Sequence, residues 1–146
     1  MIPIKVLVPS GVLGLGFDLE ALNNGVKNNP DIISIDGGST DSGPYSLGSG
    51  TSKYSRAAIK AEWKSLMIAR KKANVPLVIG SCGTCGTNRM VDWMENITTE
   101  LAEELNQNIK IAKLYCQQEK NFIKKNLQLR KICLLYTSPS PRDSDQ

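Results

Sequence analysis

Residues 76–87 begin with Pro76-Leu77-Val78-Ile79-Gly80 and continue as Ser81-Cys82-Gly83-Thr84-Cys85-Gly86-Thr87. The first part is short and apolar, which is typical of a central parallel strand covered on both faces. The second part is rich in small residues, and apolar residues at helical spacing follow it. A strand, a small-residue loop and a helix in this order predict one unit of a parallel α/β sheet.

The same alternation extends over the rest of the chain. We predict helices from a cap at Asp18, over residues 56–73, along the apolar face from Met90 to Leu105, and from near Gln118. We predict strands at residues 4–8, 31–36, 77–80 and 109–115. This order favours an α/β fold with a mostly parallel four-stranded sheet and helices on both faces. It would be a Rossmann-like three-layer arrangement, which we expect to be incomplete.

The end of the chain has a different character. The run from Cys133 to Asp143 is similar, letter for letter, to one reading frame of a transposon-end adapter used in sequencing libraries. We therefore expect a truncated N-terminal α/β domain over residues 1–132, and a non-native, disordered read-through tail over residues 133–146. The alternative is a native disordered tail rich in serine and proline.

Composition and charge narrow the class of protein. The chain has 146 residues, of which 40% are hydrophobic, so one compact domain fits and a second does not. We find no secretory signal and no apolar stretch that could span a membrane, and we expect a cytoplasmic protein without a membrane partner. The net charge is +4. The cations cluster on predicted helices, as at Arg70-Lys71-Lys72, without interleaved aromatic residues, so we expect no nucleic-acid partner. The sequence is also compatible with a homo-oligomer.

The chain contains no histidine, the usual general base and the commonest metal ligand. Cys82 and Cys85 form a Cys-x-x-Cys motif before a predicted helix, a setting that can lower a thiol pKa. The alternatives are thiol redox chemistry, a tight turn built from small residues, and a metal-binding or other covalent role. Cys116 does not complete a zinc site, so we predict no metal site, and the sequence identifies no cofactor.

Three loops follow predicted strands at residues 9–17, 36–55 and 80–88, and should meet at one edge of the sheet. In the first loop, backbone groups could bind an anion, although turn glycines are the alternative. In the third loop, the backbone could stabilise developing negative charge. The candidate binding residues of these two loops are Ser10, Gly11, Gly14, Ser81, Cys82 and Gly83.

The second loop combines carboxylates with hydroxyls directly after a strand. Asp36 and Asp41 are candidate catalytic residues, because a carboxylate at a strand's carboxyl end can act as a base, bind a hard cation such as Mg²⁺, or accept hydrogen bonds from substrate hydroxyls. Both could instead cap turns. A solvated loop and a packing tyrosine are the alternatives for the later residues of this loop, which lacks a P-loop motif. The candidate substrate-binding residues are Ser39, Thr40, Tyr45, Lys53, Tyr54 and Arg56.

Four segments together resemble the N-terminal part of the acyclic terpene utilisation protein A (AtuA) family. They are residues 8–14, 35–45, 53–56 and 79–86, and the most specific is Asp36-Gly37-Gly38-Ser39-Thr40-Asp41-Ser42-Gly43-Pro44-Tyr45. The resemblance covers residues 3–127 and implies a catabolic role in the breakdown of branched terpene-derived acids or thioesters. Family members often carry Gly, Ala or Ser where this chain has Cys82 or Cys85.

These observations support three functional hypotheses. The first is the N-terminal part of an AtuA-like catabolic enzyme that acts on a small organic acid or acyl thioester at the carboxyl edge of the sheet. The second is a non-catalytic module that binds a nucleotide or acidic metabolite. The third is a redox protein that works through Cys82 and Cys85.

Overall fold

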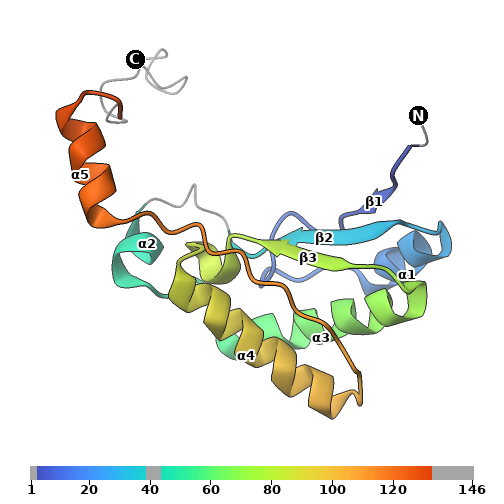
Figure 1. The fold of residues 1–146 in the computed structure, drawn as a ribbon. Coiled ribbons are helices and arrows are strands. Elements are labelled where there is room, and N and C mark those ends of the chain that lie inside the picture. The colour runs from blue at the N-terminus through green and yellow to red at the C-terminus, as the bar shows by residue number, and fades with distance from the viewer. Residues whose placement is uncertain (1–2, 39–43, 133–146) are drawn as a thin grey trace, which may run out of the picture. The chain divides into compact units, whose positions relative to one another are not determined.

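The computed structural model describes residues 3–38 and 44–132 (Figure 1). The chain divides into two compact units, Met1–Cys116 and Gln117–Gln146. The second unit contains helix α5 (Lys120–Gln128), which has no buried residue among those described. All other helices and strands described below belong to the first unit.

The sheet confirms the mixed α/β class and the parallel arrangement. It contains three parallel strands, β1 (Val6–Leu7), β2 (Ile32–Asp36) and β3 (Leu77–Gly80), in the order β1-β2-β3 among the described residues. Ile35 on β2 is in register with Ile79 on β3. The middle strand is therefore β2, whereas β3 lies at an edge of the described sheet.

Three long helices cover the sheet, namely α1 (Leu19–Lys27), α3 (Arg56–Ala73) and α4 (Asn88–Glu104). Each begins after a polar cap whose side chain accepts backbone N–H groups of the first turn, as expected for Asp, Ser and Thr at this position. The caps are Asp18, Ser55 and Thr87. No helix in the described ranges is long and apolar enough to cross a membrane.

The layering differs from the prediction of helices on both faces. The β1-α1-β2 and β2-α3-β3 connections step in the same direction, so right-handed crossovers put both helices on one face of the sheet. Figure 1 shows α1, α3 and α4 on that same side. Val6, Val8 and Val78 are 54%, 59% and 44% exposed. An apolar strand sequence indicates burial but does not show which face is covered. The described residues of the first unit form one helical layer on the sheet (Figure 1).

The core lies between this helical layer and the sheet. Ile33 and Ile35 point from β2 into it, while Leu66 on α3 and Ile97 on α4 meet them from the other side. These aliphatic side chains are nearly inaccessible to water, so their burial stabilises the packing of helices on sheet. The core thus fixes the strand ends from which the loops emerge.

The predicted fourth strand is not formed in the described chain: residues 109–115 have no regular secondary structure. Their apolar and polar residues alternate, but alternation shows only that a segment can have one wet and one dry face. A strand also needs backbone hydrogen bonds to a neighbouring strand, and the sequence of residues 109–115 does not show which strand that would be.

Two short elements were not predicted. Helix α2 (Tyr45–Ser49) lies within the predicted loop, and a 3₁₀ turn occupies Cys82–Thr84. Helix α2 ends at Gly50, whose φ of 63° is in the left-handed region that favours glycine. Its Gly and Ser content gave no helical signal because both residues have modest helix propensity.

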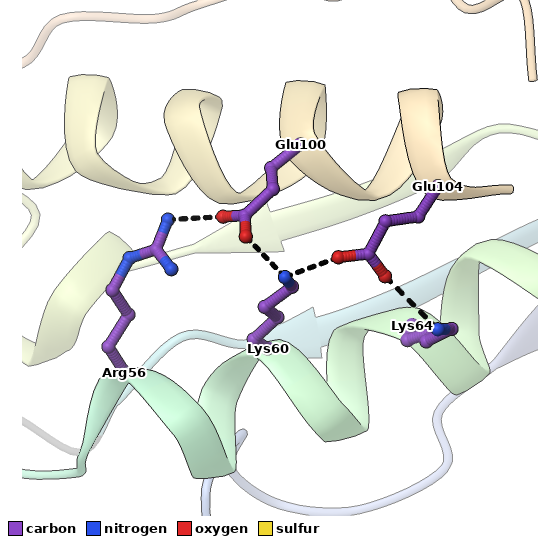
Figure 2. A network of polar contacts seen from close by, with 5 residues as sticks. All are labelled: Arg56, Lys60, Lys64, Glu100 and Glu104. Carbon is purple, nitrogen blue, oxygen red and sulfur yellow. Dashed lines mark hydrogen bonds and ion pairs between the residues drawn. The ribbon is translucent and has the colours of Figure 1, made fainter.

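Helices α3 and α4 are joined by a row of ion pairs (Figure 2). Lys60 lies between Glu100 and Glu104 and forms an ion pair with both. Arg56 Nη2 lies 2.6 Å from Glu100 Oε2, and Lys64 Nζ lies 3.1 Å from Glu104 Oε2. Hydrogen bonds from Lys60, and then from Arg56, lower the pKa of Glu100, and those from Lys60 and Lys64 lower the pKa of Glu104.

Candidate functional site

Thr84 joins the loops at the carboxyl edge of the sheet. Its backbone N–H donates to the carbonyl of Gly37 (3.2 Å), and its Oγ1 accepts the backbone N–H of Lys53 (3.0 Å). Thr84 is only 2% exposed. The loop after β3 therefore lies between the end of β2 and the segment that leads into α3, as the parallel topology predicts.

The loop after β3 has an unusual backbone. Ser81 (φ 46°) and Thr84 (φ 74°) have positive φ, although neither is glycine. Such conformations are sterically unfavourable for residues with a Cβ, and they occur often at functional sites. Gly83 also has a positive φ (58°), and a Cβ there would lie 2.5 Å from Met90 Sδ. Tight packing against α4 thus requires glycine at this position.

Asp36 is the last residue of β2 and is exposed to solvent. Its Oδ1 accepts the backbone N–H of Gly38 (3.0 Å), and its carbonyl accepts the N–H of Leu13 (2.8 Å). The side chain thus makes a local turn of the kind that aspartate commonly stabilises. Its exposed position also leaves the carboxylate accessible to a small molecule at this edge.

The first glycine loop already binds an anion of its own chain. The backbone N–H of Gly14 donates to Glu62 Oε2 (2.7 Å), and that of Gly16 donates to Glu62 Oε1 (2.8 Å). The loop therefore holds a carboxylate from α3, as its backbone donors suggested, but the carboxylate is a side chain. Ser10 makes a local contact with Val12 (3.4 Å), and Gly11 has open space around its Cα.

Tyr54 packs against this same loop. A Cβ at Gly14 would lie 2.5 Å from Tyr54 Cγ, and the φ of Gly14 is 107°. The ring also packs against the hydrophobic core. Tyr54 therefore combines the packing role with a position at the surface of a cleft described below.

The cleft described below is lined by Tyr54 but not by Tyr45, Lys53 or Arg56. Arg56 is paired with Glu100, which directs its guanidinium along the surface between α3 and α4. Lys53 Nζ lies 5.9 Å from the centroid of the Tyr54 ring. Tyr45 begins α2 and is 79% exposed. The three remaining candidates, Ser39, Thr40 and Asp41, lie outside the described residues.

Cys82 and Cys85 are not joined by a disulfide. Cys82 is buried, and this burial raises the pKa of its thiol. Cys85 is half-buried and its thiol donates to Thr87 Oγ1 (3.6 Å). A raised pKa disfavours the reactive thiolate, which argues against Cys82 as a nucleophile. Over the described ranges, no three His, Cys, Asp or Glu side chains gather in a way that could hold a metal ion.

A cleft of about 680 Å³ opens beside these loops, between residues 50–54 and the first turns of α4. The loop contributes the hydroxyls of Thr51 and Ser52, and α4 contributes Arg89 and Asn96. The rings of Tyr54 and Trp93 supply apolar surface. This volume is within the usual range for small-molecule sites, about 300–1,000 Å³.

Arg89 is a cleft residue that the sequence analysis missed, and the same is true of Thr51, Ser52, Trp93 and Asn96. None of the ion pairs found in the described part of the chain involves Arg89, and its Nη1 lies 3.8 Å from the position of a Cβ on Gly50. The acidic side chain of this cleft, Asp92, accepts hydrogen bonds from Lys113 and Tyr115. The sequence does contain a signal for Arg89, because it is a cation in the first turn of a helix that follows a small-residue loop at the same sheet edge.

The cleft and its loops give the chain a candidate site with a defined lining. Comparison with family models, curated proteins and solved structures gave no match. The assignment of a function therefore starts from the side chains that surround this cleft.

Proposed function

We propose that the cleft beside Arg89 binds a small organic anion, either an organic acid or an acyl thioester. The observation that carries this proposal is a guanidinium that lines the cleft and has no acidic partner in the described chain. Arginine forms strong, directional hydrogen bonds with carboxylates and phosphates. The hydroxyls of Thr51 and Ser52 add neutral donors to the same space.

The remaining lining suits the organic part of such a ligand. Tyr54 and Trp93 offer flat apolar surfaces, which favour contact with an acyl chain or a heterocycle. Asp92 is occupied by hydrogen bonds from Lys113 and Tyr115, which reduces its repulsion of an anion. Together these features support an amphipathic anion over a cation.

Asp36 is our candidate for proton transfer in an AtuA-like catabolic enzyme, of which this chain would be the N-terminal part. It is connected to the cleft by the hydrogen bonds from Thr84 to Gly37 and from Lys53 to Thr84. Ser81 and Gly83 lie on the same strained loop, where backbone donors could stabilise developing charge. We place this activity in the cytoplasm, and we propose that a second helical layer completes the sheet as a Rossmann-like fold.

The binding test compares Arg89→Gln with Lys72→Gln. Both residues are exposed cations on helices, but Lys72 lies in the last turn of α3 and is outside the cleft lining. With butyrate, coenzyme A and butyryl-coenzyme A as probes in calorimetry, we expect Arg89→Gln to weaken binding at least about tenfold. We expect Lys72→Gln to change binding less than about twofold. Equal binding by Arg89→Gln and the parent protein would contradict the proposal.

A non-catalytic binding module is the second candidate, and the turn made by Asp36 Oδ1 with Gly38 favours it. Mass spectrometry after incubation with butyryl-coenzyme A separates the two. Consumption by the parent and none by Asp36→Asn, with binding retained, supports the enzyme. Binding without any product supports the module.

The thiol hypothesis is the third candidate, and the raised pKa of Cys82 counts against it. A double variant, Cys82→Ser with Cys85→Ser, tests it in the presence and absence of a reductant. We expect the double variant to retain the parent's binding and turnover under both conditions. Loss of activity in this variant alone would support a mechanism that uses the two thiols.

A further inference from the structure

A second hollow lies on the other side of α4's first turns from the cleft and shares no lining residue with it. This groove has a volume of about 490 Å³. Its walls come from α3, β3, α4 and the extended residues 109–114, all within the first compact unit. It is therefore a separate feature of the molecule, and the role assigned to Arg89 does not explain it.

Most of the groove is apolar. Trp63 and Met67 on α3, Leu77 and Ile79 on β3, Met94 on α4 and Ile111 line it. Trp63 Nε1 donates to Thr98 Oγ1 (2.9 Å), so the polar atom of this ring is already satisfied. A volume of this size with such a lining is suited to the apolar body of a small ligand.

The polar groups of the groove are unbalanced in charge. Arg70 Nε is buried and has no hydrogen-bond partner among the described residues. Arg70 and Lys110 line the groove, and neither takes part in an ion pair of the described chain. The acidic residue of the lining, Glu95, is paired with Lys113 at 2.6 Å. A buried donor without an acceptor is unfavourable, and a bound carboxylate would supply the acceptor.

We propose that this groove binds an amphipathic monocarboxylate, with its hydrocarbon body between α3, β3 and residues 109–114 and its carboxylate on Arg70. The orphaned Nε and the surplus of cations favour an anionic head group. The apolar walls favour a hydrocarbon body over a polar metabolite. This proposal is independent of the anion proposed beside Arg89.

Trp63 provides the readout. The chain contains two tryptophans, and Trp93 lines the cleft beside Arg89. In a Trp93→Phe background, the fluorescence of Trp63 therefore reports on the groove alone. The probes are octanoate and decanoate below their micelle concentrations, with decylamine as a probe of similar hydrocarbon length and opposite charge. We expect a saturable change with the carboxylates and none with decylamine.

Arg70→Gln, made in the same background, tests the head-group contact, with circular dichroism to confirm the fold. We expect it to weaken decanoate binding at least about tenfold. Arg89→Gln should leave decanoate binding unchanged, so failure of the groove and failure of the cleft are distinguishable. If Arg70→Gln does not fold, Arg70→Lys replaces it. Lysine keeps the charge without the Nε donor, and we expect an intermediate affinity.

Three results would overturn the proposal. The first is decanoate binding to Arg70→Gln, or to Arg70→Lys where that variant replaces it, with the parent's affinity. The second is saturable binding of decylamine as tight as that of decanoate. The third is a doubled mass in light scattering together with no fluorescence response to decanoate, which would mean that a second copy of the chain occupies the groove.

Discussion

The loop after β1 and the loop before α3 are both rich in glycine, but the second one lies beside an open cleft. Both lie at the carboxyl edge of the sheet, and both contain candidate binding residues. In the first loop, Glu62 accepts the N–H groups of Gly14 and Gly16, so the anion is part of the fold. Beside the second loop, Arg89 lines a cleft and has no acidic partner in the part of the chain that the structure describes. A glycine-rich loop can therefore bind a side chain of its own protein, or it can lie beside a cleft that is open to a ligand.

The largest effect should come from Gly14→Ala, which breaks the first loop. The new Cβ would lie 2.5 Å from the Tyr54 ring, and the φ of 107° is unfavourable for any residue with a Cβ. We expect a loss of about 2–4 kcal/mol in the free energy of unfolding, measured by urea denaturation. Gly11→Ala is the matched control, since nothing lies within 4 Å of a Cβ there. Equal losses in both variants would refute this account of the loop.

Glu62→Ala removes the internal anion while leaving the loop sequence intact. The N–H groups of Gly14 and Gly16 then lose a charged acceptor, and we expect a loss of about 1–3 kcal/mol in stability. Glu103→Ala, at an exposed position on α4, should change stability by less than about 0.5 kcal/mol. Added acetate should restore part of the loss if the loop is an anion site. An unchanged stability of Glu62→Ala would mean that the loop is a turn and not an anion site.

Thr84→Val tests how the second loop is anchored. Valine has a similar shape but cannot accept the backbone N–H of Lys53, which donates to Thr84 Oγ1 at 3.0 Å. We expect a loss of about 1–2 kcal/mol in stability and weaker binding in the cleft. Thr84→Ser keeps the acceptor and should bind the probes more tightly than the valine variant. Identical behaviour of the two variants would exclude this hydrogen bond as the anchor.

The smallest effect concerns the link between the helices that carry Glu62 and Arg89. Because Lys60 and its neighbours lower the pKa values of Glu100 and Glu104, the folded pKa lies below the unfolded one. The contribution to stability is therefore present above the unfolded pKa and is lost as the pH falls through the folded pKa.

Urea denaturation between pH 7 and pH 3 measures this effect, which is modest because the pairs are exposed. The comparison uses a variant with Glu100→Gln and Glu104→Gln. We expect the stability difference between parent and variant to shrink as the pH falls. A difference that stays constant over this range would mean that the ion pairs contribute nothing to folding.

The sequence predicted those parts of the fold that depend on local chemistry. The helix at 56–73 and the strand at 77–80 have the predicted bounds, since Ser55 caps the first and Pro76 precedes the second. The strand at 109–115 was expected from alternation, but its hydrogen-bonding neighbour is not encoded locally. The prediction that β3 is covered on both faces is not confirmed in the described residues of the first unit, because right-handed crossovers place α1 and α3 on the same face of the sheet.

The site was predicted less completely than the fold. The topology correctly brings the ends of β2 and β3 and the segment before α3 together at Thr84. Glu62 and Arg89 were missed because charged residues on predicted helices resemble a solvated surface. Glu62 accepts a hydrogen bond from Gly16, 46 positions away in sequence, and Arg89 lines the cleft together with Gly50, 39 positions away. Such long-range pairs are not visible in a spacing pattern.

The exposed valines on the uncovered face of the sheet have a calorimetric consequence. Unfolding raises the heat capacity mainly by transferring apolar side chains from the interior to water. Val6, Val8 and Val78 are already half hydrated in the folded chain, so they contribute little to that change. The heat-capacity increment and the urea m-value should both be smaller than for a sheet of the same length with two covered faces. The stability curve of the chain should accordingly be broad and shallow with temperature.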